Sequence, residues 1–248
     1  MAESVSQKTR LKWLDEFRGL TIISMVFYHA MWDLVFLYGR QAQWYVSDAG
    51  YIWQQSICMS FILISGFCYH MDKKPVKRGL LISFWGIVIS IVTAIAEPSA
   101  IIIFGILTFY GATILLTTLF NKLLLKVPPI LGMIISILLF VITKKVSYGY
   151  LSLGNIRILD LPSYLYRNYL TTFFGFMHQG FYSSDYFPII PWIFLFLTGY
   201  FFYRIWENSR LKVMDIKRST FLSVLGKHSL LIYIIHQPIL SLLFMLVF

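Results

Sequence analysis

Charged residues are scarce in this chain. Asp, Glu, Lys and Arg account for 13% of its 248 residues, whereas hydrophobic residues account for 58%. A typical soluble domain has about 25% charged residues. The composition therefore excludes an ordinary soluble fold, and several apolar runs approach or reach the ~20 residues with which a helix spans a bilayer.

Cysteines are few, and the common nucleotide and metal motifs are missing. Cys58 and Cys68 lie on one expected helix, separated by a rise of roughly 15 Å that excludes a disulfide between them. The sequence has no internal repeat, Walker A loop, glycine-rich dinucleotide turn or HExxH pair. These absences argue against an ATPase, a dinucleotide oxidoreductase and a zinc protease, and we predict no metal site.

Seven apolar segments predict an all-α fold, a polytopic transmembrane helical bundle that forms a single domain over residues 1–248. The stretch 144–187 is too long for a simple turn. Its aromatic part, 161–176, fits an interfacial or re-entrant helix, or an eighth crossing. The seven expected spans are 17–38, 51–70, 79–96, 100–120, 128–143, 188–206 and 229–248.

The formal charge of +10 comes from basic residues that lie between the apolar runs. This arrangement is typical of membrane topology and argues against nucleic-acid binding. With seven spans, only five of the 21 lysines and arginines fall on one side of the membrane: Arg40, Lys144, Lys145, Arg157 and Arg167. The positive-inside rule therefore predicts a cytoplasmic N-terminus and a C-terminus outside. An eighth crossing would spoil this bias, so we reject it.

The first expected span carries two ionisable residues near its middle. His29 and Asp33 are spaced i and i+4, which places them on one face of a helix. Ionisable side chains at bilayer depth cost about 2.5–3.5 kcal/mol on insertion scales and usually mark a functional site. A carboxylate that holds one imidazole nitrogen makes the other a better base, so we predict a catalytic pair. A polar pair that only locks helix packing is the alternative.

Arg18 precedes His29 by three helical turns on nearly the same face. Two interpretations stay open for this residue. It is either an interfacial arginine paired with Asp15, or a guanidinium that grips a phosphate or thioester oxygen at the cytoplasmic mouth.

Three further residues are predicted to bind substrate. His236 lies in the last span, shortly before Pro238, and either lines a cavity or is hydrogen-bonded within the bundle. His178 and Asp185 stand just outside the sixth span, where an acid can hold an amine or a hydroxyl donor. A solvated turn is the alternative for this loop.

Five stretches, in chain order, carry a resemblance to a known family: LDEFRGLTIISMVFYH, FILISGFCYH, FGILTFYGATILL, DYFPIIPW and HSLLIYIIHQPIL. They resemble the heparan-alpha-glucosaminide N-acetyltransferase catalytic-domain family, in particular its short bacterial members, within the wider group of membrane-bound acyltransferases. The resemblance covers most of the chain. Thr108 stands where the resemblance leads us to expect His.

The resemblance implies a helical bundle that takes acyl-CoA, commonly acetyl-CoA, on the cytoplasmic side. The acyl group moves to an amine or hydroxyl of a sugar reached from the opposite side. By motif position, Arg18 and His29 are the Arg and His of the first helix, and Asp33 follows them. Asp185 is the acid of the DYFP segment, and His236 is the His before proline in the last helix.

We therefore expect an acyl-CoA-dependent N- or O-acetyltransferase of the bacterial inner (plasma) membrane. Its partners are the lipid bilayer, acyl-CoA and a cell-surface sugar, and a homodimer is left open. Arg18, Lys77 and Arg78 are the expected ligands of the cofactor phosphates.

Three alternatives remain. In a proton-coupled transporter, His29, Asp33 and His236 would relay protons. A haem cytochrome would use His29 and His236, or another pair of histidines, as axial ligands, but no two histidines have the single-helix spacing of stacked haems. A catalytically silent member of the same fold is the third alternative.

Overall fold

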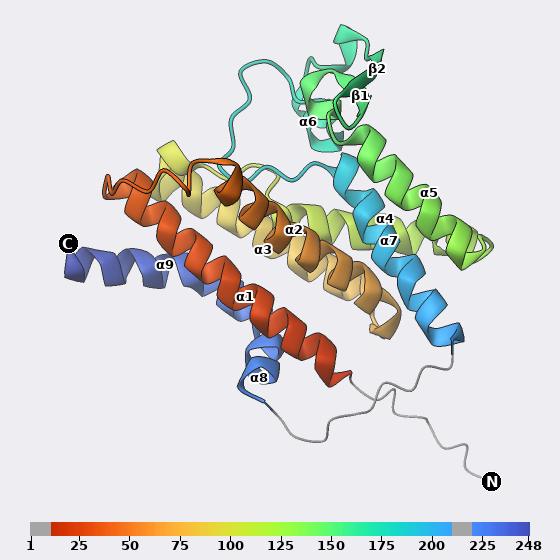
Figure 1. Ribbon diagram of the computed structural model, residues 1–248, viewed down its shortest axis with the longest axis horizontal. Helices are drawn as coiled ribbons and strands as arrows, with labels where there is room; N and C mark the ends of the chain where they lie inside the picture. The colour runs from red at the N-terminus through yellow and green to blue at the C-terminus, as the bar shows by residue number, and fades with distance from the viewer. Residues whose placement is uncertain (1–10, 210–219) are drawn as a thin grey trace. The chain divides into compact units, whose positions relative to one another are not determined.

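The computed structural model describes residues 11–209 and 220–248, which form nine α-helices and one two-stranded sheet (Figure 1). The α-helices are α1 (Lys12–Trp32), α2 (Asp48–Cys68), α3 (Pro75–Ala96), α4 (Ile106–Leu124), α5 (Pro129–Thr143), α6 (Tyr169–Phe174), α7 (Ile189–Asn208), α8 (Phe221–Lys227) and α9 (Ser229–Val247). The short elements are η1 (Asp33–Leu37), η2 (Tyr69–Met71), η3 (Pro98–Ala100), η4 (Val146–Tyr148), η5 (Ser163–Leu165), β1 (Tyr150–Leu153) and β2 (Ile156–Asp160).

Seven helical segments of the described residues are long and apolar enough to cross a membrane, which confirms the predicted number of spans. The chain is therefore a multi-pass membrane protein. The segments are Lys12–Leu37, Asp48–Met71, Pro75–Ala96, Ile106–Leu124, Pro129–Tyr148, Ile189–Asn208 and Ser229–Val247.

The fourth span begins later than the sequence predicted. Residues 100–120 were expected, but α4 starts at Ile106 and residues 101–105 are not helical. This segment forms hydrogen bonds with the loop before α7: the Ser184 amide donates to the Ile101 carbonyl (3.0 Å) and the Phe187 amide to the Phe104 carbonyl (2.9 Å). Because these bonds hold the backbone outside a helix, hydropathy alone placed the boundary too early.

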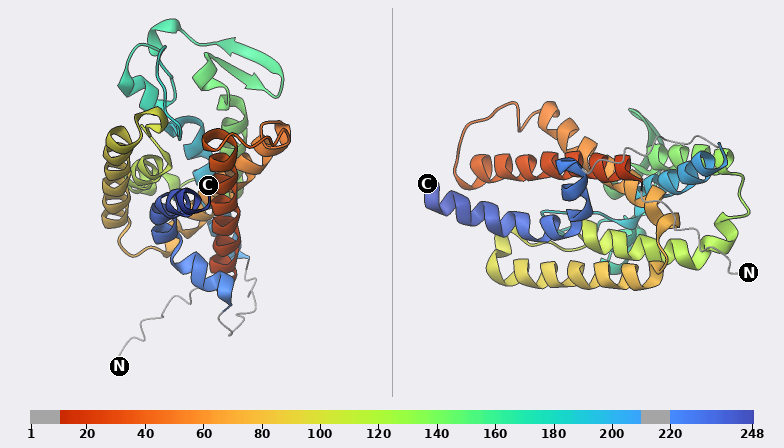
Figure 2. Two further views of the ribbon diagram at one scale, coloured as in Figure 1. Left: turned by 90° about the vertical axis from the view of Figure 1, so that its left-hand side faces the viewer. Right: turned by 90° about the horizontal axis from the view of Figure 1, so that it is seen from below.

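The chain divides into two compact units, one of Met1–Ile64 with Leu211–Phe248 and the other of Ser65–Arg210. In the first unit, α1 packs against α8 (Figure 2). Two glycines lie in this contact. A Cβ on Gly19 would lie 2.0 Å from the Leu222 carbonyl oxygen, and one on Gly226 would lie 1.8 Å from that of Asp15. Such close approach of backbones is typical of membrane helices that meet through small residues.

The helices α2 and α9 also pack against α1 in this unit. Ile22 and Met25 of α1 form a buried cluster with Ile57 of α2. Along α1 and α9, ring contacts join His29 to His236 and Tyr38 to Phe244, so the two helices run in the same direction. Two spans run in the same direction when an odd number of other spans lies between them. Five lie between the first and the seventh, which contain α1 and α9.

The second unit contains two antiparallel helix pairs. The right-hand view of Figure 2 shows α3 and α4 side by side. In this pair, a Cβ on Gly86 would lie 2.7 Å from the Thr108 hydroxyl. The helices α5 and α7 pack together in the same manner, with Gly132 against the Phe201 ring. A second contact joins the rings of Phe140 and Trp192. Residue numbers therefore rise along α5 as they fall along α7, so the two helices run in opposite directions. An eighth crossing between them would have made α5 and α7 parallel.

A β-hairpin occupies part of the stretch 144–187, and the sequence analysis missed it. The strands β1 and β2 are antiparallel, with Leu153 opposite Ile156 and a two-residue Gly-Asn loop whose Gly154 has φ +60°. A Gly-Asn loop between β-branched and aromatic residues is a hairpin signal. The part 161–176, expected as an interfacial or re-entrant helix, forms only η5 and the six residues of α6.

The α1–α8 contact generates a stability prediction. The substitution Gly226→Ala should lower the free energy of unfolding by about 1–3 kcal/mol, because the new methyl group overpacks the Asp15 backbone. Thermal unfolding in detergent micelles measures the change, with the exposed neighbour Lys227→Ala as the control. An unchanged midpoint for Gly226→Ala would show that the two helices are not in backbone contact.

Candidate functional site

Two histidines from different helices meet in the first unit. The ring centroids of His29 on α1 and His236 on α9 lie 4.8 Å apart, with the rings inclined at 63°. His236 is buried and His29 is partly buried. Both belong to segments apolar enough to span a membrane. The sequence predicted a functional role for each of these residues, and the structure brings the two rings together.

Asp33 is fully buried, one turn after His29, and its partner is on α9. The Gln237 amide nitrogen donates to Asp33 Oδ1 (2.7 Å). In the part of the chain that the structure describes, no hydrogen bond joins Asp33 to His29, although their spacing predicted a contact. The reason is geometric, because Gln237 presents an N–H group from the facing helix while the His29 ring turns toward His236.

The hydrogen bonds of His236 fix its tautomer. Its Nδ1 lies 2.6 Å from the carbonyl oxygen of Tyr233. A carbonyl only accepts, so Nδ1 carries a proton and donates it. In a neutral ring Nε2 then holds a lone pair, and this atom is buried without a hydrogen-bond partner among the described residues.

Aromatic residues lie beside His29, whose ring centroid is 5.9 Å from that of Tyr28. The ring centroids of Tyr28 and Trp53 are 5.3 Å apart, and Trp44 stacks on Trp53 at 5.9 Å. Tyr45 donates its hydroxyl proton to the Tyr28 carbonyl (3.0 Å), and burial raises the pKa of the Tyr45 phenol. Half of the Trp44 surface is exposed. The cluster of Tyr28, Trp44, Tyr45 and Trp53, the aromatic cluster, therefore extends from the histidine to the surface of the first unit.

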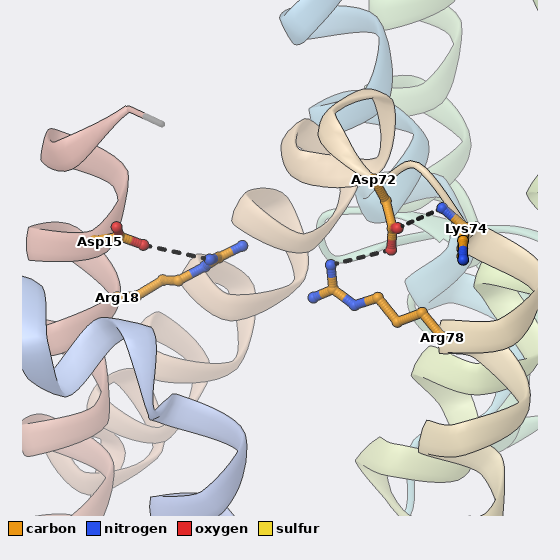
Figure 3. A network of polar contacts seen from close by, with 5 residues as sticks. All are labelled: Asp15, Arg18, Asp72, Lys74 and Arg78. Atoms are coloured by element: carbon orange, nitrogen blue, oxygen red, sulfur yellow. Dashed lines mark hydrogen bonds and ion pairs between the residues drawn. The ribbon is translucent and has the colours of Figure 1, made fainter. Parts of the chain in front are cut away.

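Arg18 is held at the start of α1. Its Nη1 lies 3.8 Å from Asp15 Oδ1, and its side chain retains 19% of its exposed surface (Figure 3). On the same turn, Glu16 accepts a hydrogen bond from the hydroxyl of Thr220 (2.7 Å), the residue that caps α8. The pairing with Asp15 was one of the two interpretations left open, and it leaves part of the guanidinium accessible.

In the second unit, the predicted phosphate ligands lie at the start of α3. Lys77 and Arg78 are exposed, and Arg78 Nη1 pairs with Asp72 Oδ2 at 3.4 Å. The other oxygen of Asp72 accepts from the Lys74 amide (2.9 Å), which orders the turn before the helix (Figure 3). Pro75 suits the first position of α3 because that position needs no N–H donor.

Asp185 and His178, the two loop residues predicted to bind substrate, form hydrogen bonds within the second unit. Asp185 Oδ2 accepts from the Ile106 amide at the first turn of α4 (3.1 Å). Gly105, the residue before α4, has no side chain to do this, and a Cβ there would lie 2.9 Å from the same carboxylate oxygen. His178 Nδ1 lies 2.9 Å from the hydroxyl of Thr172, which is fully buried.

Two tyrosines form further hydrogen bonds in the stretch between α5 and α7. Tyr186 donates its hydroxyl proton to the Thr172 carbonyl and Tyr166 to the Val146 carbonyl, both at 2.6 Å. Burial raises the pKa of both phenols, so they remain hydrogen-bond donors at neutral pH. Hydrogen bonds therefore order the stretch between α5 and α7.

The structure also explains the threonine at position 108. Thr108 lies in the contact between α3 and α4, against Gly86. The longer side chain of a histidine would have to leave this contact. Residues 11–209 and 220–248 contain no group of three or more His, Cys, Asp or Glu side chains placed to hold a metal ion.

The sequence was compared with models of known protein families. The sequence model described as heparan-alpha-glucosaminide N-acetyltransferase, catalytic, matches residues 10–238. The chain belongs to this family. The match includes Arg18, His29, Asp33, His178, Asp185 and His236. No curated protein and no solved structure gave a significant match.

Membership of the heparan-alpha-glucosaminide N-acetyltransferase family makes the chain a member of an acetyltransferase-type family of membrane proteins. The sequence analysis missed Gln237, which anchors Asp33. A glutamine beside His236 in an apolar span was the available signal, because polar side chains inside membrane helices hydrogen-bond across to other helices.

Asp185 generates a second stability prediction. Asp185→Ala should lower the free energy of unfolding by about 0.5–2 kcal/mol, the range for losing a helix cap, because the Ile106 amide loses its acceptor. Asp185→Asn keeps an oxygen in that place and should lose less. Thermal unfolding of the three proteins in detergent tests this order, and equal midpoints would contradict the capping role.

Proposed function

We propose that this protein transfers an acetyl group from acetyl-CoA, bound at the cytoplasmic side, to an amine or hydroxyl of a cell-surface sugar. The family supplies the reaction type. The observation that supports a reaction centre in this chain is the meeting of His29 and His236, 4.8 Å apart, inside membrane-spanning segments.

His29 is the group that we propose acts on the acetyl transfer, with Asp33 as its support one turn later. A base must take the proton of the attacking amine or hydroxyl as the new bond to the carbonyl carbon forms. Alternatively, the imidazole carries the acetyl group between donor and acceptor. Asp33 acts in either case through the electrostatics of the site and through Gln237, because its hydrogen bond goes to that residue.

Acetyl-CoA carries several phosphate charges, which need cations at the membrane surface. Arg18 keeps part of its guanidinium accessible, and Lys77 and Arg78 are exposed. Arginine and lysine at a surface bind phosphate oxygens. The asymmetry of basic residues supports an orientation in which the N-terminus and these cations face the cytoplasm and the C-terminus lies outside.

A sugar acceptor is supported by the aromatic cluster beside His29. Trp44 exposes half of its surface and stacks on Trp53, which contacts Tyr28 next to the histidine. Aromatic faces offer a large apolar surface for one face of a sugar ring. His178 and Asp185 are proposed to shape the acceptor side indirectly, by ordering the loop before α7.

We propose a single functional domain in the inner (plasma) membrane. The helix α2 runs from Asp48 to Cys68 and thus belongs to both compact units. The family match over residues 10–238 likewise covers both. A lipid bilayer, acetyl-CoA and the sugar are the proposed partners.

The reacting histidine can be tested directly. His29→Ala should lower the rate of acetyl transfer by about 10²-fold or more, because a positioned base contributes about 10²–10⁴-fold. Purified protein, radiolabelled acetyl-CoA and membrane glycans provide the assay. The control is Phe27→Ala, whose side chain is exposed two residues away. Transfer at the wild-type rate in the His29 variant would refute its role, and sugar uptake into proteoliposomes without acetyl-CoA would favour a transporter.

The phosphate contacts predict a selective loss of affinity. The double variant Lys77→Ala, Arg78→Ala should bind acetyl-CoA about 2- to 30-fold more weakly, since exposed charge pairs contribute about 0.2–1 kcal/mol each. The effect should shrink at high salt. Binding of S-acetyl-N-acetylcysteamine, which has the thioester without phosphates, should not change. The control Arg157→Ala removes a basic residue of β2, and an equal loss in that variant would contradict the proposal.

A further inference from the structure

Two consecutive residues of α9 each have a buried hydrogen-bond acceptor that meets no donor among the described residues. They are Nε2 of His236 and Oε1 of Gln237. Each is fixed by the hydrogen bond at the other end of its own side chain. A buried acceptor without a donor costs about 1–3 kcal/mol, so two adjacent ones suggest a ligand that supplies donors.

The orientation of each side chain follows from elementary chemistry. His236 donates from Nδ1 to the Tyr233 carbonyl (2.6 Å), which leaves its lone pair on Nε2. Gln237 donates from its amide nitrogen to Asp33 (2.7 Å), because an amide oxygen would be repelled by the carboxylate, and this turns Oε1 away from Asp33. Both residues are therefore set to accept, and neither is set to donate to a ligand.

His236 is suited to be a base in its neutral form. The residue is 8% exposed, and a second imidazole, His29, lies 4.8 Å away. Burying an imidazolium beside another imidazole in an apolar span is unfavourable without a carboxylate partner. Gln237 engages only Oδ1 of the Asp33 carboxylate. Its Oδ2 is buried without a hydrogen-bond partner among the described residues, so neither oxygen is bonded to His236.

We propose that His236 is the general base for the acetyl acceptor and that Gln237, positioned by Asp33, holds a second donor of the same molecule. The acceptor class is thus a compound with at least two N–H or O–H groups, such as an amino sugar. This inference rests on the proposed function. It differs from it in assigning the proton of the acceptor to His236, whatever carries the acetyl group.

The step balances without a further reactant. The acceptor N–H or O–H gives its proton to Nε2 of His236. The electron pair left on the acceptor nitrogen or oxygen forms a bond to the acetyl carbonyl carbon. The bond from this carbon to the leaving atom, either the CoA sulfur or a nitrogen of His29, breaks with its electron pair. The proton then passes from His236 to the leaving atom, which restores the neutral base.

Access to these buried atoms requires local movement in α9. Pro238 follows Gln237 and has no N–H group, so the carbonyl of residue 234 lacks its usual helical donor. Because α9 lacks a backbone hydrogen bond at this turn, we place there the movement that admits the acceptor.

The first experiment tests the tautomer without any turnover. The nitrogen-15 spectrum of histidine-labelled protein in lipid nanodiscs should contain a neutral ring protonated on Nδ1, and this signal should vanish in His236→Asn. The variant keeps a side-chain N–H near the position of Nδ1 and removes Nε2. A neutral ring protonated on Nε2 at this position would overturn the proposal.

The second experiment measures kinetics with glucosamine as the acceptor probe. His236→Asn should lower kcat by about 10²–10⁴-fold while the affinity for acetyl-CoA, measured by calorimetry, stays unchanged. Gln237→Leu should raise the KM for glucosamine without changing acetyl-CoA binding. His228→Asn, at an exposed histidine before α9, is the matched control and should behave as wild type.

The outcomes separate the two proposals. Wild-type protein that binds no acetyl-CoA would overturn the proposed function, whatever the histidine spectrum. Wild-type protein that transfers acetyl groups, with undiminished kcat in His236→Asn, would overturn only the assignment of the base. If His236→Asn does not fold, His236→Gln takes its place, and the spectrum of the wild type still decides the tautomer.

Discussion

A carboxylate without any exposed surface inside a membrane-spanning helix must find a donor on another helix, and Gln237 supplies it to Asp33. This bond ties α9 to the end of α1 and, four residues earlier on α1, sets the His29 ring against His236. Two polar contacts thus join these helices within their membrane-spanning segments, Asp33 with Gln237 and His29 with His236. In lipid, where apolar surface alone does not drive helices together, such a bond also specifies which faces meet.

Glycines provide the second constraint, because they decide how closely the helices approach. Gly19 and Gly226 bring α1 against α8, and Gly86 and Gly132 do the same for the helix pairs of the second unit. Close packing is the main source of helix association in a membrane. It follows that positions such as Thr108, opposite Gly86, are limited in size by packing, and a polar residue with a catalytic task must lie elsewhere.

The number, order and approximate limits of the spans could be predicted because hydropathy is a local property that tertiary contacts do not reverse. Contacts between distant segments could not be predicted. The delayed start of α4 depends on backbone bonds to residues 183–187, and the partner of Asp33 is 204 positions away rather than four. The i, i+4 rule predicted a contact between His29 and Asp33, but it had no information about a donor on a facing helix, and Asp33 bonds to Gln237 instead.

The same contacts support the proposed class of acceptor. In the described residues, Nδ1 of His236 is committed to the Tyr233 carbonyl and the Gln237 amide N–H to Asp33, which leaves Nε2 and Oε1 as acceptors on α9. Two acceptors fixed in this way suit a substrate that brings its own protons. An acyl acceptor with an amine or hydroxyl, as proposed above, is such a substrate.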